Sequence, residues 1–371
     1  MLSPKWPPGF TAVLFLGCVS ACTVSLPLPA PAAVPAQETL PAASEPGALL
    51  AEIIAQVTPA PLSKSIGDLS GEWPVEIGGE PYTLASRVHL NGDAVLKATQ
   101  YVYEHLRNPE LTVTYFDWQL PAGVVTKGRN VVASLPGSTL PEEIVLMTAH
   151  VDDMVDKDVD PAGIAIPRPP IPVVDPLWNK YPAPGADDNA SGTAGVLLAA
   201  QILAGYRFAR TVRFVFFTGE ENGYLGSYAY ASAMRNAGEN IVAVFNLDML
   251  AYDRKGEPVV DVNMRAPGDS PLDGPLADVF LKIVGDYRLN LVPERQYQTG
   301  FYVGSDHGMF WFRGYPAISI MEDGSGDFNP YYHSQYERLE HLNMTYCTNV
   351  IQAAVGAVAY IAGPLGPIPE T

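Results

Sequence analysis

The chain has 371 residues, of which 47% are hydrophobic and 17% charged, and its formal net charge is −18. This length and composition suit a folded domain with a sizeable core. The acidic balance argues against nucleic acid or an anionic membrane surface as a partner. The three cysteines, Cys18, Cys22 and Cys347, do not have zinc-ribbon spacing, and the single one beyond the N-terminal region excludes an internal disulfide in the folded part.

The first residues have the pattern of an export signal. Lys5 precedes a mostly apolar run, from 10 to 22, that is too short to span a bilayer comfortably. Small residues stand before Cys22, as in a bacterial lipobox, in which the cysteine is lipidated and becomes the N-terminus. Cleavage after Ala21, with release of a soluble protein, is the alternative. We therefore expect a signal peptide over residues 1–22 and an exported protein, either lipid-anchored at Cys22 or free in the periplasm or medium.

Residues 23–47 are rich in Pro and Ala, which predicts an extended linker rather than part of a core. The folded domain is expected over residues 48–371. Within it, helical spacing or Ala- and Leu-rich composition predicts helices, and compact apolar runs predict strands. In chain order, we expect a helix at 94–106, strands at 111–115, 130–135 and 143–148, a helix at 190–204, a strand at 211–217, a helix at 224–234, strands at 241–247 and 316–321, and a helix at 343–362.

Strands that alternate with helices predict one α/β domain, whose central sheet is mixed but mostly parallel and carries helices on both faces. A Pro-rich stretch without periodicity runs from 151 to 184. A loop of that length inside a domain is typical of a functional or mobile segment.

Three of the predicted strands run directly into residues that can bind metal. The strand at 143–148 leads to His150, the strand at 211–217 leads to Glu220 and Glu221, and the strand at 241–247 leads to Asp248. Sites in α/β folds form outside the carboxyl ends of the strands. Any one polar strand end is compatible with a solvated turn, but the three together predict a site at this edge of the sheet.

Other residues add to this set. His150 and Asp152 alternate, so in extended backbone they point the same way, which suits a ligand histidine held by a carboxylate. Asp188 precedes the predicted helix at 190–204, where the plain interpretation is a turn and helix cap. His333 lies in a late loop and offers a second histidine.

The order and local context of these segments resemble the secreted bacterial di-zinc aminopeptidases of the leucyl aminopeptidase type, whose relatives include glutaminyl cyclase and the transferrin-receptor ectodomain. The resemblance covers about residues 85 to 345, and it implies the zinc exopeptidase fold. The stretches that carry it are His150-Val-Asp152, Gly185 to Gly192, Glu220 to Ser227, Asn246 to Met249, Ser305 to His307 and His333 to Glu337.

The resemblance implies two Zn²⁺ ions and a role for each site residue. His150 and Asp248 would bind one zinc, Glu221 and His333 the other, and Asp188 would bridge them. Asp152 would orient His150, Glu220 would act as general base and acid, and Tyr302 would hydrogen-bond the oxyanion. Three carboxylates against two Zn²⁺ leave a positive site that can hold a bridging hydroxide. The expected substrates are peptides with a free N-terminus.

Other functions remain open on the same scaffold. A glutaminyl cyclase would use one zinc, and a carboxypeptidase-like metallohydrolase has its ligands in a similar order. A surface binding protein without catalysis is an alternative of another class. The chain has neither the Gly-x-Ser-x-Gly elbow of serine hydrolases nor a Gly-rich phosphate loop.

Overall fold

The computed structural model describes residues 47–89, 92–121, 125–157, 159–164, 181–299 and 303–368. The predicted signal peptide and nearly all of the predicted linker lie outside these ranges, and the first helix begins at Ala48.

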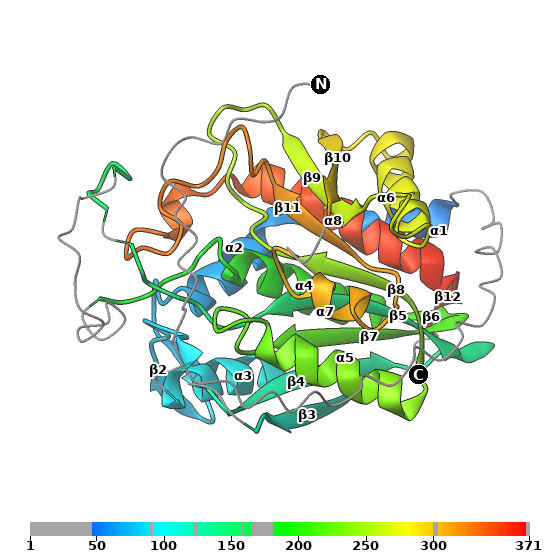
Figure 1. Ribbon diagram of the computed structural model, residues 1–371, viewed down its shortest axis with the longest axis horizontal. Coiled ribbons are helices and arrows are strands. Elements are labelled where there is room, and N and C mark those ends of the chain that lie inside the picture. Colours follow the sequence, from blue (N-terminus) through cyan, green and yellow to red (C-terminus); the bar gives the residue numbers. More distant parts are fainter. Residues whose placement is uncertain are drawn as a thin grey trace, which may run out of the picture. The chain divides into compact units, whose positions relative to one another are not determined.

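Within the described part of the chain, the central sheet has eight strands (Figure 1). Their order across the sheet is β10 (Val292–Gln298), β9 (Val259–Arg265), β11 (Ile318–Glu322), β8 (Asn240–Leu247), β5 (Leu140–His150), β7 (Arg210–Phe217), β4 (Lys127–Leu135) and β3 (Thr112–Gln119). β5 pairs in parallel with both β7 and β8, and β11 is parallel to β8. β9 runs antiparallel to β11, as β4 does to β7 and β3 to β4. The sheet is therefore mixed and mostly parallel, as predicted.

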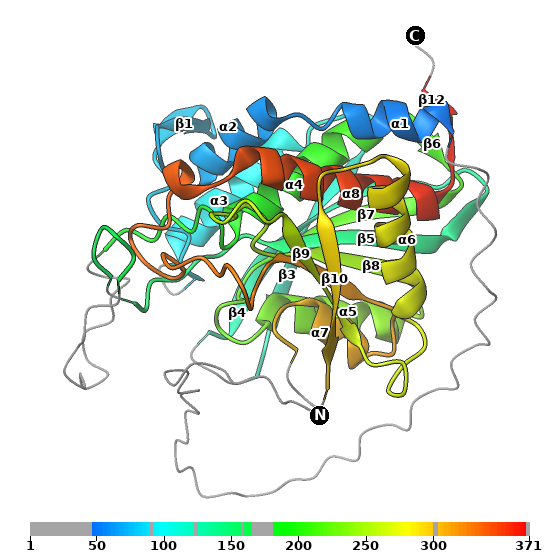
Figure 2. The same ribbon diagram turned by 90° about the horizontal axis from the view of Figure 1, so that it is seen from above.

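Helices cover both faces of this sheet (Figure 2). One face carries α1 (Ala48–Ala55), α2 (Pro59–Leu69), α3 (Asp93–His105), α4 (Ala190–Leu203), α6 (Gly274–Asp286) and α8 (Met344–Ala362), and the other carries α5 (Leu225–Ala237) and α7 (His307–Trp311). Two small sheets pair β1 (Val75–Ile77) with β2 (Glu80–Tyr82) and β6 (Tyr206–Phe208) with β12 (Pro364–Pro367). A 3₁₀ turn covers Leu339–His341.

The apolar runs of the central strands explain why both faces are covered. On β5, Val145 and Met147 belong to the core shared with α4 and α8, whereas Ile144 and Leu146 belong to the core under α5 and α7. Because successive side chains of a strand point to opposite faces, an uninterrupted apolar strand needs a partner layer on each side.

The predicted elements are all present, with ends shifted by a few residues. The sequence pattern did not predict α1, α2, α6, α7, β9, β10 or the short strands of the two small sheets. β10 shows the reason, since the edge strand VPERQYQ is mostly polar and has no buried residue. α2 begins Pro-Ala-Pro and contains Gly67, which masks its helical pattern.

α8 is long and apolar enough to cross a membrane by composition alone, but 72% of its apolar window is buried inside the protein. Its neighbours include α1, α2, α4 and α6. It is therefore a core helix.

Candidate metal centre

The parallel pairing of β5, β7 and β8 brings the predicted strand-end residues together. His150 is the last residue of β5 and lies opposite Phe217, the last residue of β7. On the other side, Thr148 pairs with Asn246, so Asp248 emerges level with His150. The loops that follow β5 and β11 gather at this same end of the sheet (Figure 1). The strand register alone therefore places His150, Asp248 and the turn with Glu220 and Glu221 side by side.

Asp188 lies between the two histidines. Its Oδ1 is 3.1 Å from His150 Nε2, and its Oδ2 is 3.1 Å from His333 Nε2. His333 Nε2 is also 3.1 Å from Glu221 Oε2, and His150 Nε2 is 3.3 Å from Asp248 Oδ1. The five residues thus form a chain in which each histidine faces one carboxylate of its own and one oxygen of Asp188.

Electrostatics couple these groups. Burial opposes a charge on His150, but Asp248, Glu220 and Asp188 outweigh it and raise its pKa well above the usual value. Burial likewise opposes ionisation of Asp188, yet both histidines hold its pKa well below the ordinary range. Burial raises the pKa of Glu221 to about 7, although His333 opposes that shift. The charge of each of these groups therefore depends on the oppositely charged groups beside it.

Hydrogen bonds fix the orientation of Asp248. The Ser305 hydroxyl donates to Asp248 Oδ2, which leaves Oδ1 facing His150. Asn246 Nδ2 donates to Ser305 Oγ at 2.8 Å, and its Oδ1 accepts from Thr148 Oγ1 at 2.8 Å. One oxygen of Asp248 is thus held by the protein and the other is directed into the site.

Asp152 is fully buried beside His150, but its contacts differ from those of a simple His–carboxylate pair. Its backbone oxygen lies 3.1 Å from His150 Nδ1, whereas its Oδ1 is 3.9 Å away from that nitrogen. Its carboxylate accepts hydrogen bonds from the amides of Glu220 (3.3 Å) and Glu221 (3.4 Å). Asp152 therefore links the end of β5 to the turn after β7.

Two further carboxylates support His333. Asp156 Oδ1 lies 3.3 Å from His333 Nδ1, on the ring side opposite Asp188. The buried Glu337 accepts from the amides of His333 (3.0 Å), Asp187 (3.1 Å) and Asp188. Sequence patterns assigned neither of them a role. Asp156 and His333 are brought together only by the fold, and the Glu337 contacts are to backbone atoms, which leave no pattern in a sequence.

The metal-binding capacity of these residues rests on their chemistry and on unpaired atoms. Glu221 Oε1 is buried and has no hydrogen-bond partner among the described residues, and Asp188 Oδ1 has His150 Nε2 beside it at 3.1 Å. The ligand atoms of His150, Glu220 and Asp248 lie within 4.8 Å of one another, and so do those of His150, Asp188 and Glu221. A buried carboxylate oxygen without a donor is costly unless a cation binds it. Imidazole and carboxylate at this spacing fit zinc.

Among the predicted site residues, Tyr302 lies outside the described residues. His307 is described and buried, and its Nε2 is 3.3 Å from Gln298 Oε1. Burial lowers the pKa of His307 to about 3, so this ring is neutral.

Comparison with known proteins agrees with this geometry. Residues 130–358 match the family described as Peptidase family M28. A protein of Saccharomyces cerevisiae named "Probable aminopeptidase" is 28% identical over 256 residues, which cover 67% of this chain and 60% of the relative. A "Probable leucine aminopeptidase" of Trichophyton verrucosum is 27% identical over 233 residues, covering 61% of this chain and 55% of the relative. The chain thus matches less than two thirds of the length of these relatives.

Solved structures share the fold. The LapA aminopeptidase of Legionella pneumophila aligns with a TM-score of 0.63 at 18% identity and covers 85% of this chain and 74% of LapA. Glutaminyl cyclase of Bacteroides thetaiotaomicron aligns with a TM-score of 0.59 at 18% identity and covers 82% of this chain and 98% of the cyclase. The family match covers most of the folded part, and the sheet edge brings two histidines and three carboxylates together. The chain belongs to peptidase family M28.

Proposed function

We propose that this protein is a di-zinc aminopeptidase that removes the N-terminal residue of peptides. The observation that carries the proposal is the position of Asp188, which presents one oxygen to His150 and the other to His333. A carboxylate placed in this way suits a bridge between two metal ions. The names of the matched relatives support the aminopeptidase reaction.

In this proposal each zinc has one histidine and one carboxylate of its own. His150 and Asp248 hold the first ion, and His333 and Glu221 hold the second. His150 can serve only one ion, because Nε2 has a single lone pair and Nδ1 already faces the Asp152 carbonyl. The position of His333 Nε2, 3.1 Å from Glu221 Oε2, favours it as the histidine of the second ion.

Bound zinc would polarise the scissile carbonyl and lower the pKa of the attacking water. Glu220 is the residue we assign to proton transfer. Its carboxyl oxygen lies within 4.8 Å of ligand atoms of His150 and Asp248, next to where the water would react. Burial, opposed by His150 and reinforced by Glu221 and Asp248, raises the pKa of Glu220 well above its usual value. A carboxylate with a raised pKa is a stronger base, so it can accept a proton from water and return it to the leaving amine.

The negative charge of nearby side chains supports the proposed preference for a free N-terminus in the substrate. Buried acidic side chains lie at the site, including Asp152 and Asp248 beside His150. A free α-ammonium group gains from such surroundings, whereas a substrate carboxylate is repelled. Tyr302 remains the proposed hydrogen-bond donor to the oxyanion.

The proposal is tested with leucine p-nitroanilide and its N-acetylated form, before and after removal of metal with a chelator. We expect the free amine to be cleaved and the blocked substrate to resist. Activity should be lost with the chelator and return with zinc, and metal analysis should give two zinc ions per chain. Cleavage of the blocked substrate alone would refute an aminopeptidase. Cyclisation of an N-terminal glutamine by a protein with one zinc would instead identify a glutaminyl cyclase, and zinc binding without turnover of any peptide would identify a binding protein.

We also propose that the protein is exported and anchored in the cell envelope by a lipid on Cys22. The apolar segment and the small residues before Cys22 support this proposal. Labelling with a radioactive fatty acid in a bacterial host should mark the wild type and not Cys22→Ser. Labelling of neither protein, with both found soluble outside the cytoplasm, would support ordinary signal cleavage instead.

A further inference from the structure

Arg87 is a fully buried arginine that lies behind the metal centre and outside every motif of the site. Its side chain has 1% exposure. It stands between α2 and α3, in an extended segment where Ser86 pairs with Ala183 and the Ala183 amide donates to the Ala85 carbonyl. A buried guanidinium is costly unless its donors are satisfied and its charge is balanced.

The donors of Arg87 are satisfied by backbone carbonyls from separate segments. Nε donates to Val151 at 2.7 Å, in the residue that follows His150. Nη1 donates to Pro184 at 2.7 Å and Nη2 to Gly185 at 3.0 Å, in the loop that leads to Asp188. Nη1 also donates to Leu69 at 2.5 Å, at the end of α2. One side chain thus holds both ends of the connection between β5 and α4.

Asp153 balances the charge of Arg87. Its Oδ2 is 3.3 Å from Arg87 Nη1, and its two oxygens accept from the Arg87 amide at 2.9 and 2.8 Å. Asp153 lies three residues after His150 in the chain. The ion pair therefore adds a second attachment to the same loop.

The packing around Gly185 shows how closely these parts meet. Gly185 has a φ of +46°, and a Cβ there would lie 2.9 Å from Arg87 Nη2 and 2.2 Å from the Asp188 carbonyl oxygen. The backbone of the Asp188 loop has therefore been brought against the guanidinium with no space for a side chain.

We propose that Arg87 is a positioning residue that sets the distance between His150 and Asp188, and thereby the affinity of the site for zinc. The proposal rests on the assignment of these two residues as zinc ligands. The planar guanidinium presents donors in fixed directions, so carbonyls at both ends of the β5–α4 connection can be held at once. A lysine keeps the charge that Asp153 requires but has one nitrogen, which cannot reach the same set of carbonyls.

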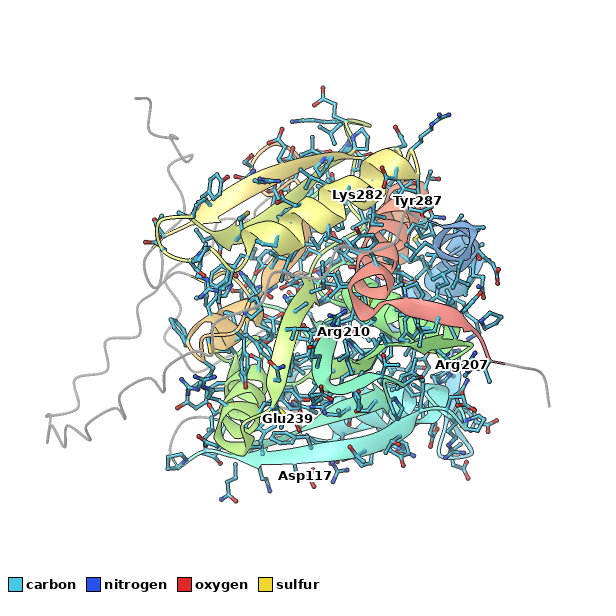
Figure 3. All side chains as sticks on the ribbon, turned by 90° about the vertical axis from the view of Figure 1, so that its right-hand side faces the viewer. Asp117, Arg207, Arg210, Glu239, Lys282 and Tyr287 are labelled. Carbon is cyan, nitrogen blue, oxygen red and sulfur yellow. The ribbon has the colours of Figure 1, made fainter. Side chains whose placement is uncertain are left out.

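The test compares Arg87→Lys with Arg210→Lys as a matched control. Arg210 is also buried and pairs with Glu143 and the Ile361 carbonyl, but it lies at the start of β7, at the opposite end of the parallel strands from the metal centre (Figure 3). Zinc affinity is measured on metal-free protein by competition with a chromophoric chelator, and thermal unfolding is measured on the same metal-free samples.

We expect Arg87→Lys to bind zinc roughly 10–100-fold more weakly than wild type, the range typical for residues that orient metal ligands. Arg210→Lys should lose thermal stability yet bind zinc as wild type does. In zinc-saturated protein, Arg87→Lys should lower kcat for leucine p-nitroanilide and leave KM unchanged, because misplaced ligands affect the reaction more than substrate contacts.

Wild-type zinc affinity in a folded Arg87→Lys variant would overturn the inference, and so would equal losses of affinity in both variants. If Arg87→Lys does not fold, Asp153→Asn takes its place. That change keeps the side-chain volume and weakens the same attachment, so it should also lower zinc affinity, and an unchanged affinity would count against the proposal. If wild type itself binds no zinc, the proposed function fails, which is a result distinct from failure of the role of Arg87.

Discussion

Glu220 and Glu221 are neighbours in the chain but face different parts of the metal centre. Glu221 Oε2 lies beside His333, whereas the Glu220 carboxyl groups with His150 and Asp248. The amides of both residues are held by Asp152, so the turn after β7 has a fixed orientation. Different roles for two identical side chains follow from which way each one points.

Glu220→Gln should separate metal binding from catalysis. The amide keeps the size of the side chain but cannot accept the proton, so we expect kcat to fall by roughly 10²–10⁴-fold. Zinc content, measured by elemental analysis, should stay at the wild-type level. Glu142→Gln, at an exposed position on β5, is the control and should change neither quantity. A normal kcat in Glu220→Gln with zinc bound would contradict the assigned role.

Asp261, on β9, should make the free energy of unfolding depend on pH. Burial, partly offset by hydrogen bonds from Gln296 and the Gly324 amide, raises the pKa of Asp261 to about 6. In the unfolded chain an aspartate has a pKa of about 3.9. The folded state thus binds more protons between these values, and its stability falls as pH rises from about 4 to about 6.

Asp261→Asn should remove this contribution, which amounts to at most about 3 kcal/mol. We expect the variant to be more stable than wild type above about pH 6, and its urea midpoint to change less with pH below that point. Asp269→Asn, at an exposed position, serves as control. An identical pH profile for wild type and Asp261→Asn would show that Asp261 does not titrate as described.

At the scale of elements, the start of α4 lies directly against the end of β8. The Asn189 side chain accepts from the Gly192 amide at 2.9 Å and donates to the Leu247 carbonyl at 2.8 Å. A Cβ on Gly192 would lie 2.3 Å from Asn189 Oδ1 and 2.5 Å from the Leu247 oxygen. This close approach places Asp188 and Asp248, which flank the contact in sequence, at one centre.

Gly192→Ala should force α4 away from β8. We expect it to lower the free energy of unfolding by about 1–3 kcal/mol, as overpacking does in other cores, and to weaken zinc binding as well. Gly285→Ala is the matched control, because a Cβ there meets no atom within 4 Å and the residue lies in α6. Alanine should stabilise that helix by up to about 1 kcal/mol. Urea unfolding measures the free energy of unfolding of both variants. An unchanged free energy of unfolding in Gly192→Ala would contradict the tight contact.

For the whole molecule, the metal centre joins parts of the fold that are far apart in the chain. Its proposed ligands come from the end of β5, the loop before α4, the turns after β7 and β8, and the loop before α8. Zinc that binds only the folded state stabilises all of these connections together, by about 4 kcal/mol at a thousand-fold excess over its dissociation constant.

Removal of zinc should therefore lower the Tm, by roughly 5 °C or more. Differential scanning calorimetry with and without chelator measures the shift. Asp188→Asn should start from a lower Tm in the presence of zinc, and its Tm should respond less to chelator, because the carboxylate proposed to bridge the ions is lost. An equal chelator effect in both proteins would indicate that the stabilising metal binds elsewhere.

The sequence by itself determined the main α/β elements and pointed to the polar residues that the fold brings together at one edge of the sheet. Apolar runs such as β5, β7 and β8 are predictable because strands buried on both faces must be apolar along their whole length. His150, Asp248 and the paired glutamates could be found because each directly follows such a strand. Elements without this constraint, such as the polar edge strand β10, were missed.

Only the tertiary structure decided how the site is supported. Its supporting contacts join residues that are far apart in the chain. Asp156 lies beside His333, and Glu337 accepts from the amides of Asp188 and His333. Arg87 donates to carbonyls at both ends of the β5–α4 connection. Most of these contacts are made to backbone atoms, which every residue type shares. A sequence specifies side chains, so it can show which groups bind metal, whereas the backbone positions that hold them at the right distance arise only when the whole chain is folded.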